Sequence, residues 1–201
     1  TPVAFEKYAT NPEDKNFFVN INEIVSVVML LVSVGLIAMK DILIIFLGKK
    51  YEGAQFIFPF LVLMPIMYTI SETTVLGINF SKKTKYHIYI ASFSAIFNVI
   101  GNIILVPKFG ATGAAISTGL AYVVFFIFRT YFANKFYKIN FKFFKFGVCV
   151  FLVYILAAYS SKYKFNTTIL LLTIINVFVI LFAYRNIISE MIKLVKDKIG
   201  K

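Results

Sequence analysis

The hydrophobic residues of this sequence form long runs that few charged residues interrupt. Each run approaches the roughly 20 residues that an α-helix needs to cross the hydrocarbon core of a bilayer. The runs show no strand-like alternation and are too long for the strands of a membrane barrel. The pattern therefore predicts an all-α membrane protein with a bundle of about six transmembrane helices. We expect these helices at residues 24–47, 54–77, 86–106, 111–134, 146–161 and 165–184. The first of them either ends at Met39 or continues through Lys40 and Asp41 to Leu47.

The overall composition agrees with this prediction. Sixty per cent of the 201 residues are hydrophobic and 15% are charged, whereas about 25% of the residues of an average soluble domain are charged. The net charge of +12 does not indicate a nucleic-acid partner, because the basic residues lie between the apolar runs. We expect no nucleic acid as a partner. We expect the basic residues to face the phospholipid bilayer instead.

Lysine and arginine residues are distributed unequally between the two sets of connections. The set that includes both ends of the chain contains 15 of the 21 basic residues, and the other set contains 6. Because basic connections stay on the cytoplasmic side, we predict a multi-pass membrane protein with both ends in the cytoplasm. Residues 185–201 have apolar side chains at helical spacing with lysines between them, which predicts a basic amphipathic tail on the cytoplasmic leaflet. An ordinary terminus with snorkelling lysines is the alternative interpretation.

Two opposite charges lie inside the apolar runs at matching depth. Glu72 lies five residues before the end of run 54–77, and Arg129 lies five residues before the end of run 111–134. Charged side chains at membrane depth are costly and indicate function. We predict that these two residues face the bundle interior and pair, or that Arg129 meets an anionic substrate group when the pair opens. A purely structural ion pair, or snorkelling, is the alternative.

Small and polar residues form a stripe along the third run. Ala91, Ala95, Asn98 and Asn102 follow one another at spacings of four, three and four, which places them on one helix face. Small residues allow helices to approach closely, and asparagine amides form hydrogen bonds between helices in lipid. The stripe predicts helix packing, and Asn98 and Asn102 are also candidates for the lining of a polar cavity.

The second run contains two prolines and is followed by a basic cluster. Pro59 and Pro65 each remove a backbone donor and kink or break a helix. They are hinge candidates, because broken helices line cavities and move in transporters. Lys82, Lys83 and Lys85 are explained by the positive-inside distribution. A role of these lysines in binding a pyrophosphate head group is an additional hypothesis.

Side chains that support catalysis are scarce. His87 is the one histidine and Cys149 the one cysteine of the sequence, which excludes a metal site with two histidines and an internal disulfide. The sequence contains no glycine-rich phosphate loop and no nucleophile elbow. We therefore expect no enzymatic activity, no cofactor and no metal.

The segment from Gly77 to Tyr122 has a distinctive order of residues. A helix end with Gly77 is followed by basic residues and then by Asn98, Asn102, Leu105, Pro107, Phe109-Gly110 and Gly113-Ala114-Ala115. In this order the segment resembles the C-terminal half of bacterial polysaccharide flippases of the multidrug/oligosaccharidyl-lipid/polysaccharide exporter superfamily. The upstream segment from Ile42 to Ala54, with Gly48 and Tyr51, also resembles a loop of that family.

The resemblance implies a flippase that moves undecaprenyl-diphosphate-linked oligosaccharide across the membrane by alternating access, in cell-surface polysaccharide biosynthesis. Such transporters have two lobes and about 12 to 14 helices. Residues 1–134 would contribute helices of the C-terminal lobe, and residues 135–184 would add two further helices. The chain begins at Thr1 without an initiator methionine, and we expect it to be the later part of a longer protein. The resemblance implies the lipid-linked oligosaccharide as a partner and a polysaccharide polymerase as a candidate partner.

Three alternatives remain open. A drug exporter or a peptidoglycan-precursor flippase belongs to the same superfamily, although the loop from Gly110 to Ala115 favours the polysaccharide branch. A membrane-bound enzyme of polysaccharide assembly, such as an acyltransferase or a polymerase, is expected to contain a catalytic histidine in a polar setting or a large outer loop. A fragment without the other lobe is expected not to transport at all, because alternating access needs both lobes.

Overall fold

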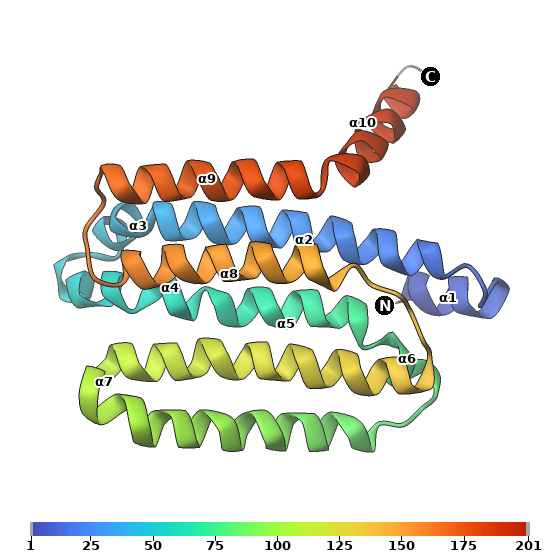
Figure 1. Cartoon of the computed structure of the whole chain (residues 1–201), viewed down its shortest axis with the longest axis horizontal. Coiled ribbons are helices and arrows are strands. Elements are labelled where there is room, and N and C mark those ends of the chain that lie inside the picture. The colour runs from blue at the N-terminus through green and yellow to red at the C-terminus, as the bar shows by residue number, and fades with distance from the viewer. Residues whose placement is uncertain (1, 200–201) are drawn as a thin grey trace.

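The computed structural model describes residues 2–199, and within this range every regular element is a helix (Figure 1). The predicted all-α fold class is therefore confirmed. In chain order the helices are α1 (Pro2–Thr10), α2 (Lys15–Ala38), α3 (Lys40–Leu47), the 3₁₀ helix η1 (Lys49–Phe56), α4 (Phe58–Leu61), α5 (Leu63–Thr74), α6 (Leu76–Phe80), α7 (Lys85–Phe136), α8 (Phe143–Ser160), α9 (Thr167–Ala183) and α10 (Arg185–Ile199).

Several of these helices have the length and apolar character of membrane spans. Among the described residues, α2, α7 and α8 are each long and apolar enough to cross a membrane. The number rises to five if two bent pairs are each counted as one span, namely η1 with α4–α5 and α9 with α10. The helices are those of a multi-pass membrane protein. The count of about six crossings and the place of these helices in a two-lobed transporter remain predictions.

Helix α7 is folded back on itself into two antiparallel arms (Figure 1). The reversal occurs at Gly110, where φ is +56° and ψ is −136°, a conformation that is open almost only to glycine. Close to the turn the arms approach so tightly that a Cβ atom on Gly113 would lie 2.3 Å from the carbonyl oxygen of Leu105. The runs 86–106 and 111–134, which the sequence predicts as separate helices, are the two arms of this hairpin.

The first apolar run, residues 24–47, is divided close to Met39, one of the two ends that the sequence allows for its first helix. Helix α2 ends at Ala38, and α3 begins at Lys40. The ammonium group of the buried Lys40 lies 2.9 Å from Oδ1 of Asp41. Oδ2 of Asp41 accepts a hydrogen bond of 2.6 Å from the backbone N–H of Phe165, beyond the end of α8. The break places both charges where they pair and bind the α8–α9 connection. The first helix therefore ends close to Met39, and the continuation of the run to Leu47 is a separate helix.

Helix α2 also begins earlier than the apolar run indicates. Asp14 is its N-cap and accepts a hydrogen bond of 3.4 Å from the backbone N–H of Phe17. Lys7 of α1 lies 2.7 Å from the same carboxylate and holds the pKa of Asp14 below its ordinary value. The start of α2 is therefore fixed by this cap, while Phe18 in its first turns is buried in an apolar cluster with Leu76.

The second run is broken next to its prolines. The axis of residues 58–74 bends by 63° from that of residues 50–56, and a further irregularity at Val62 separates α4 from α5. Pro59 lies in the first turn of α4, and Pro65 lies in the first turn of α5. The missing backbone donor of a proline costs little in a first turn, so each break lies just before its proline.

Helix α2 lies at the centre of the packing and contacts α5, α8 and α9, while α5 also packs against α7. The core between these helices includes fully buried Val34, Ile37, Ile70 and Leu156. The outer surface is apolar as well, because large side chains such as Phe144 are exposed. Apolar side chains on both the inside and the outside are typical of helices that lie in lipid.

Helix α10 leaves the bundle at the end of α9. The axis of residues 185–193 bends by 69° from that of α9, and in Figure 1 α10 projects away from the other helices. Residues 185–199 of the predicted amphipathic tail are thus helical, and residues 200–201 lie outside the described residues. The contact of this helix with a leaflet remains a prediction.

Candidate functional site

The structure brings the two charges from the apolar runs together. Nη2 of Arg129 on α7 lies 2.7 Å from Oε1 of Glu72 on α5. Nη1 of Arg129 donates a hydrogen bond of 2.7 Å to Oγ of Ser71. The arginine side chain is 7% exposed, whereas that of Glu72 is 40% exposed. The pair therefore consists of an enclosed cation and a carboxylate that reaches the surface.

Two aromatic rings complete the surroundings of the guanidinium group. Its central carbon lies 5.3 Å from the ring centre of Tyr68 and 5.1 Å from that of Phe125, which is within the range of cation–π attraction. Among the described residues, Nε of Arg129 is buried and has no hydrogen-bond partner. The group thus keeps one donor that the protein does not use.

A cavity of about 410 Å³ lies beside this pair, between α5 and the two arms of α7. Tyr68 and Phe125, the rings that contact Arg129, belong to its wall. The first arm of α7 contributes Ser94 and Asn98, together with alanines. Oγ of Ser94 is buried without a hydrogen-bond partner among the described residues. The cavity therefore combines aromatic walls with polar groups close to a buried cation.

The two asparagines of the predicted stripe bond to each other and across the α7 hairpin. Nδ2 of Asn102 donates to Oδ1 of Asn98 at 2.7 Å, and Nδ2 of Asn98 donates to Oγ1 of Thr118 at 3.3 Å. Oγ of Ser117 donates to the backbone carbonyl of Asn98 at 2.8 Å. Asn98 thus serves both helix packing and the cavity lining, whereas Asn102 is not part of that lining.

The basic cluster after α6 lies apart from the cavity. Lys82, Lys83 and Lys85 are exposed at the turn between α6 and α7, and Lys82 has a φ of +55°. Their neighbour His87 is held by Asn79, whose Oδ1 lies 2.9 Å from the imidazole Nε2. The structure therefore places these lysines at one end of the hairpin and outside the cavity wall.

A buried carboxylate was missed by the sequence analysis. Glu23 of α2 is 6% exposed, and its Oε1 lies 2.8 Å from Nζ of Lys145 and 3.0 Å from Nζ of Lys142. Nζ of Lys145 also lies 4.3 Å from the ring centre of Tyr184. The one available signal was that Glu23 and these lysines fall at the predicted cytoplasmic ends of their runs. Which helix faces which cannot be inferred from that signal.

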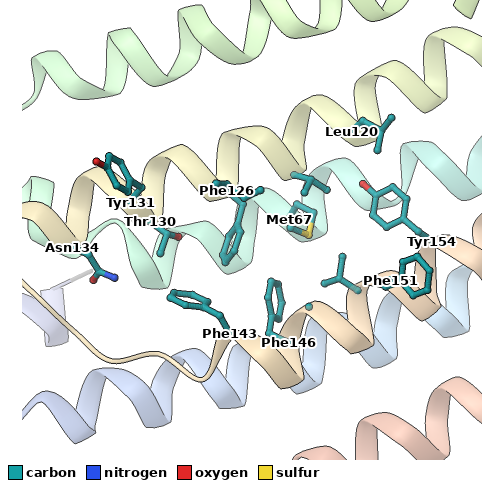
Figure 2. A pocket seen from close by; sticks show the side chains of 14 residues that line it. Met67, Leu120, Phe126, Thr130, Tyr131, Asn134, Phe143, Phe146, Phe151 and Tyr154 are labelled. Atoms are coloured by element: carbon teal, nitrogen blue, oxygen red, sulfur yellow. The ribbon is translucent and has the colours of Figure 1, made fainter.

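A larger cavity of about 740 Å³ forms a groove between α5, the second arm of α7 and α8. Figure 2 shows side chains from these helices that face across it. Met67, Phe126 and Phe146 form part of its apolar wall, while Asn134 lies near one end and Tyr154 near the other. The hydroxyl of Tyr154 is already used, because it donates a 2.7 Å hydrogen bond to the carbonyl of Gly119.

Comparison with known proteins gives one short match. No protein-family model matches the chain, and no solved structure matches it. Over 41 residues the chain is 54% identical to an uncharacterized membrane protein of Methanocaldococcus jannaschii. The match covers 20% of this chain and 8% of the length of that relative. Together with the long apolar helices, it indicates that the chain is a multi-pass α-helical membrane protein.

Proposed function

We propose that this chain is part of a flippase that moves lipid-linked oligosaccharide, carried on undecaprenyl diphosphate, across the cytoplasmic membrane. The observation that supports the proposal most directly is the enclosed guanidinium of Arg129, with its unused Nε donor, beside a polar cavity. Arginine is well suited to phosphate, because its planar fork of donors matches the phosphate oxygens. When Glu72 moves away, a cation at membrane depth also requires another anionic partner.

The pairing with Glu72 gives Arg129 two alternative states. In the first, the guanidinium group is neutralised by the carboxylate at 2.7 Å. In the second, a substrate phosphate takes the place of the carboxylate, and the half-exposed Glu72 becomes hydrated. Since the substrate binds only the second state, its arrival shifts the equilibrium toward the open pair. The ion pair is then a substrate-controlled switch.

The sugar part of the substrate needs hydrogen-bonding groups. The amide of Asn98 and the buried hydroxyl of Ser94 offer donors and acceptors on the cavity wall. The rings of Tyr68 and Phe125 provide flat apolar faces next to them. The cavity volume lies within the range of about 300 to 1,000 Å³ that is usual for small-molecule sites. A whole oligosaccharide is larger, and we propose that another lobe of a longer protein supplies the remaining surface.

The broken second run provides the movement in this proposal. Helix α5 carries Tyr68, Ser71 and Glu72, and it follows the irregularity at Val62 near Pro59 and Pro65. A rotation of α5 at this point changes the distance between Glu72 and Arg129 on α7. The two prolines therefore remain hinge candidates, because hinges are a few residues at the ends of elements.

Deletion of the full-length gene tests the transport proposal. We expect lipid-linked repeat units to accumulate in the cytoplasmic leaflet, and the wild-type gene to restore their export. Unchanged lipid-linked intermediates combined with altered drug sensitivity would contradict the proposal and favour a drug exporter.

Charge exchange in the same complementation assay tests the role of the pair. Arg129→Glu and Glu72→Arg are each expected to abolish export, because each leaves two like charges at membrane depth. The double exchange is expected to recover part of the export. Lys164→Glu, on the exposed α8–α9 connection, is the matched control and should export normally. If the double exchange is no better than either single variant, the pair does not act as a switch.

A further inference from the structure

We propose that the groove between the second arm of α7 and α8 binds one anionic phospholipid of the bilayer. In this arrangement an acyl chain occupies the groove, and the phosphate lies at the α7–α8 connection. The site is independent of transport, because it lies on the outer side of the hairpin arm and uses neither Arg129 nor Glu72.

The groove opens on the surface that faces lipid. Its floor includes the buried Met67 and Phe126, while Ile127, Tyr131 and Phe151 at its edges are exposed. Apolar side chains line nearly all of it. A groove of this kind in a membrane protein is filled by a hydrocarbon chain, because water gains no hydrogen bonds there.

The length of the groove matches one leaflet. From Leu120 to Thr130 the lining runs along ten residues of helix, which is about 15 Å at 1.5 Å per residue. Half of a hydrocarbon core of about 30 Å is the same length. The polar lining groups Thr130, Tyr131 and Asn134 follow at one end (Figure 2), where the head group of a lipid would lie.

Basic residues lie at that same end. Asn134 and Phe143 face each other there (Figure 2), and the connection between them contains Lys135, Lys138 and Lys142. Lys142 binds Glu23, whereas the exposed Lys135 and Lys138 form no ion pair within residues 2–199.

No acidic residue occurs from residue 73 to residue 189 of the sequence. Glu23 of α2 neutralises part of the charge at the α7–α8 connection, because it pairs with Lys142 and Lys145. Lys135 and Lys138 keep two positive charges without an ion pair among the described residues, next to the polar end of the apolar groove. That combination is complementary to a lipid phosphate attached to an acyl chain. It distinguishes an anionic phospholipid from a neutral lipid and from a second copy of this equally basic chain.

Native mass spectrometry of the purified full-length protein in detergent tests the proposal. Phosphatidylglycerol and phosphatidylcholine of the same chain length are titrated separately. We expect one phosphatidylglycerol to be retained at concentrations at which phosphatidylcholine is lost. Equal retention of the two lipids would overturn the proposal, because the basic connection would then have no selective effect.

Two variants locate the bound lipid. Gly147 lines the groove, and a Cβ atom there would meet nothing within 4 Å. We therefore choose Gly147→Leu to place a larger side chain in the groove. We expect it to lower retention at least about tenfold by displacing several methylene groups. Lys135→Gln with Lys138→Gln should lower affinity for phosphatidylglycerol about fivefold for each lysine removed.

The matched control carries Lys82→Gln and Lys83→Gln in the exposed basic cluster after α6. It loses the same charge and should retain phosphatidylglycerol as the wild type does. If the control loses lipid as strongly as the variant of Lys135 and Lys138, the attraction is general and the proposed site is wrong. The same conclusion follows if Gly147→Leu, with an unchanged unfolding temperature, retains the lipid normally.

Discussion

Arg129 is held inside the bundle by partners of three kinds, namely a carboxylate, a hydroxyl and two aromatic rings. Its depth in the apolar run was sufficient to predict Glu72 as the carboxylate. Ser71 and the rings were not predicted, because they depend on the rotation of α5 and α7 about their own axes. An ion pair can be inferred from matching depth, but its surroundings cannot.

Glu23 leads to a prediction about stability. Glu23→Gln should lower the free energy of unfolding by about 1 to 3 kcal/mol, because it leaves Lys145 and Lys142 without their carboxylate. Changing either lysine alone to glutamine should lower the free energy of unfolding less than Glu23→Gln does, since the other lysine still binds Glu23. Changing both should cost the most, because a carboxylate that is 6% exposed then has no cation. Denaturation in detergent micelles, followed by circular dichroism, measures these differences.

A solvent-exposed pair provides the comparison for that series. Lys7 and Asp14 lie 2.7 Å apart with side chains about one third exposed, and Lys7→Gln should lower the free energy of unfolding much less than Glu23→Gln does. If Lys7→Gln lowers the free energy of unfolding as much as Glu23→Gln does, burial does not strengthen the ion pairs of Glu23 with Lys142 and Lys145.

Among the elements, the α7 hairpin depends most on a single residue. Gly110→Ala should destabilise the protein by about 1 to 3 kcal/mol, because alanine strongly disfavours φ of +56° with ψ of −136°. A clash is not the cause, since a Cβ atom at Gly110 would meet nothing within 4 Å. Thermal unfolding of the purified variant in detergent measures the effect.

Gly35 offers the matched substitution inside a regular helix. It lies within α2, and a Cβ atom there also meets nothing within 4 Å. Gly35→Ala should raise stability by up to about 1 kcal/mol through helix propensity. If Gly110→Ala and Gly35→Ala change stability equally, the turn conformation at Gly110 is not the cause of the stability lost in Gly110→Ala.

At the scale of the whole molecule, the distribution of lysine and arginine predicts the orientation. With Cys149→Ala as background, single cysteines replace Lys83 and Lys138 on one predicted side and Lys50 and Lys162 on the other. A membrane-impermeant maleimide should label intact spheroplasts at Lys50→Cys and Lys162→Cys. The maleimide should label Lys83→Cys and Lys138→Cys only after the spheroplasts are permeabilised. Labelling of Lys83→Cys in intact spheroplasts would contradict cytoplasmic ends.

Much of the fold follows from the sequence for one physical reason. In lipid every backbone N–H and C=O must be bonded within the protein, so a long apolar run has to be helical. The runs that contain Arg129 and Glu72 were located in this way, as were both arms of α7. The sequence left open whether the first helix ends at Met39 or continues to Leu47, because the division depends on Asp41 reaching the backbone of Phe165 in a distant connection.

The sequence alone determined the helical class, the approximate position of the long apolar helices along the chain and the depth of their charged residues. Only the tertiary structure decided which faces meet, and so formed the Glu23 cluster, the cavity beside Arg129 and the groove along α8. The physical reason is that these helices are apolar on the side that faces lipid as well as on the side that faces the core. Hydrophobic periodicity, which orients the helices of a soluble protein, therefore gives little information about their rotation. Close contact between particular side chains decides it instead.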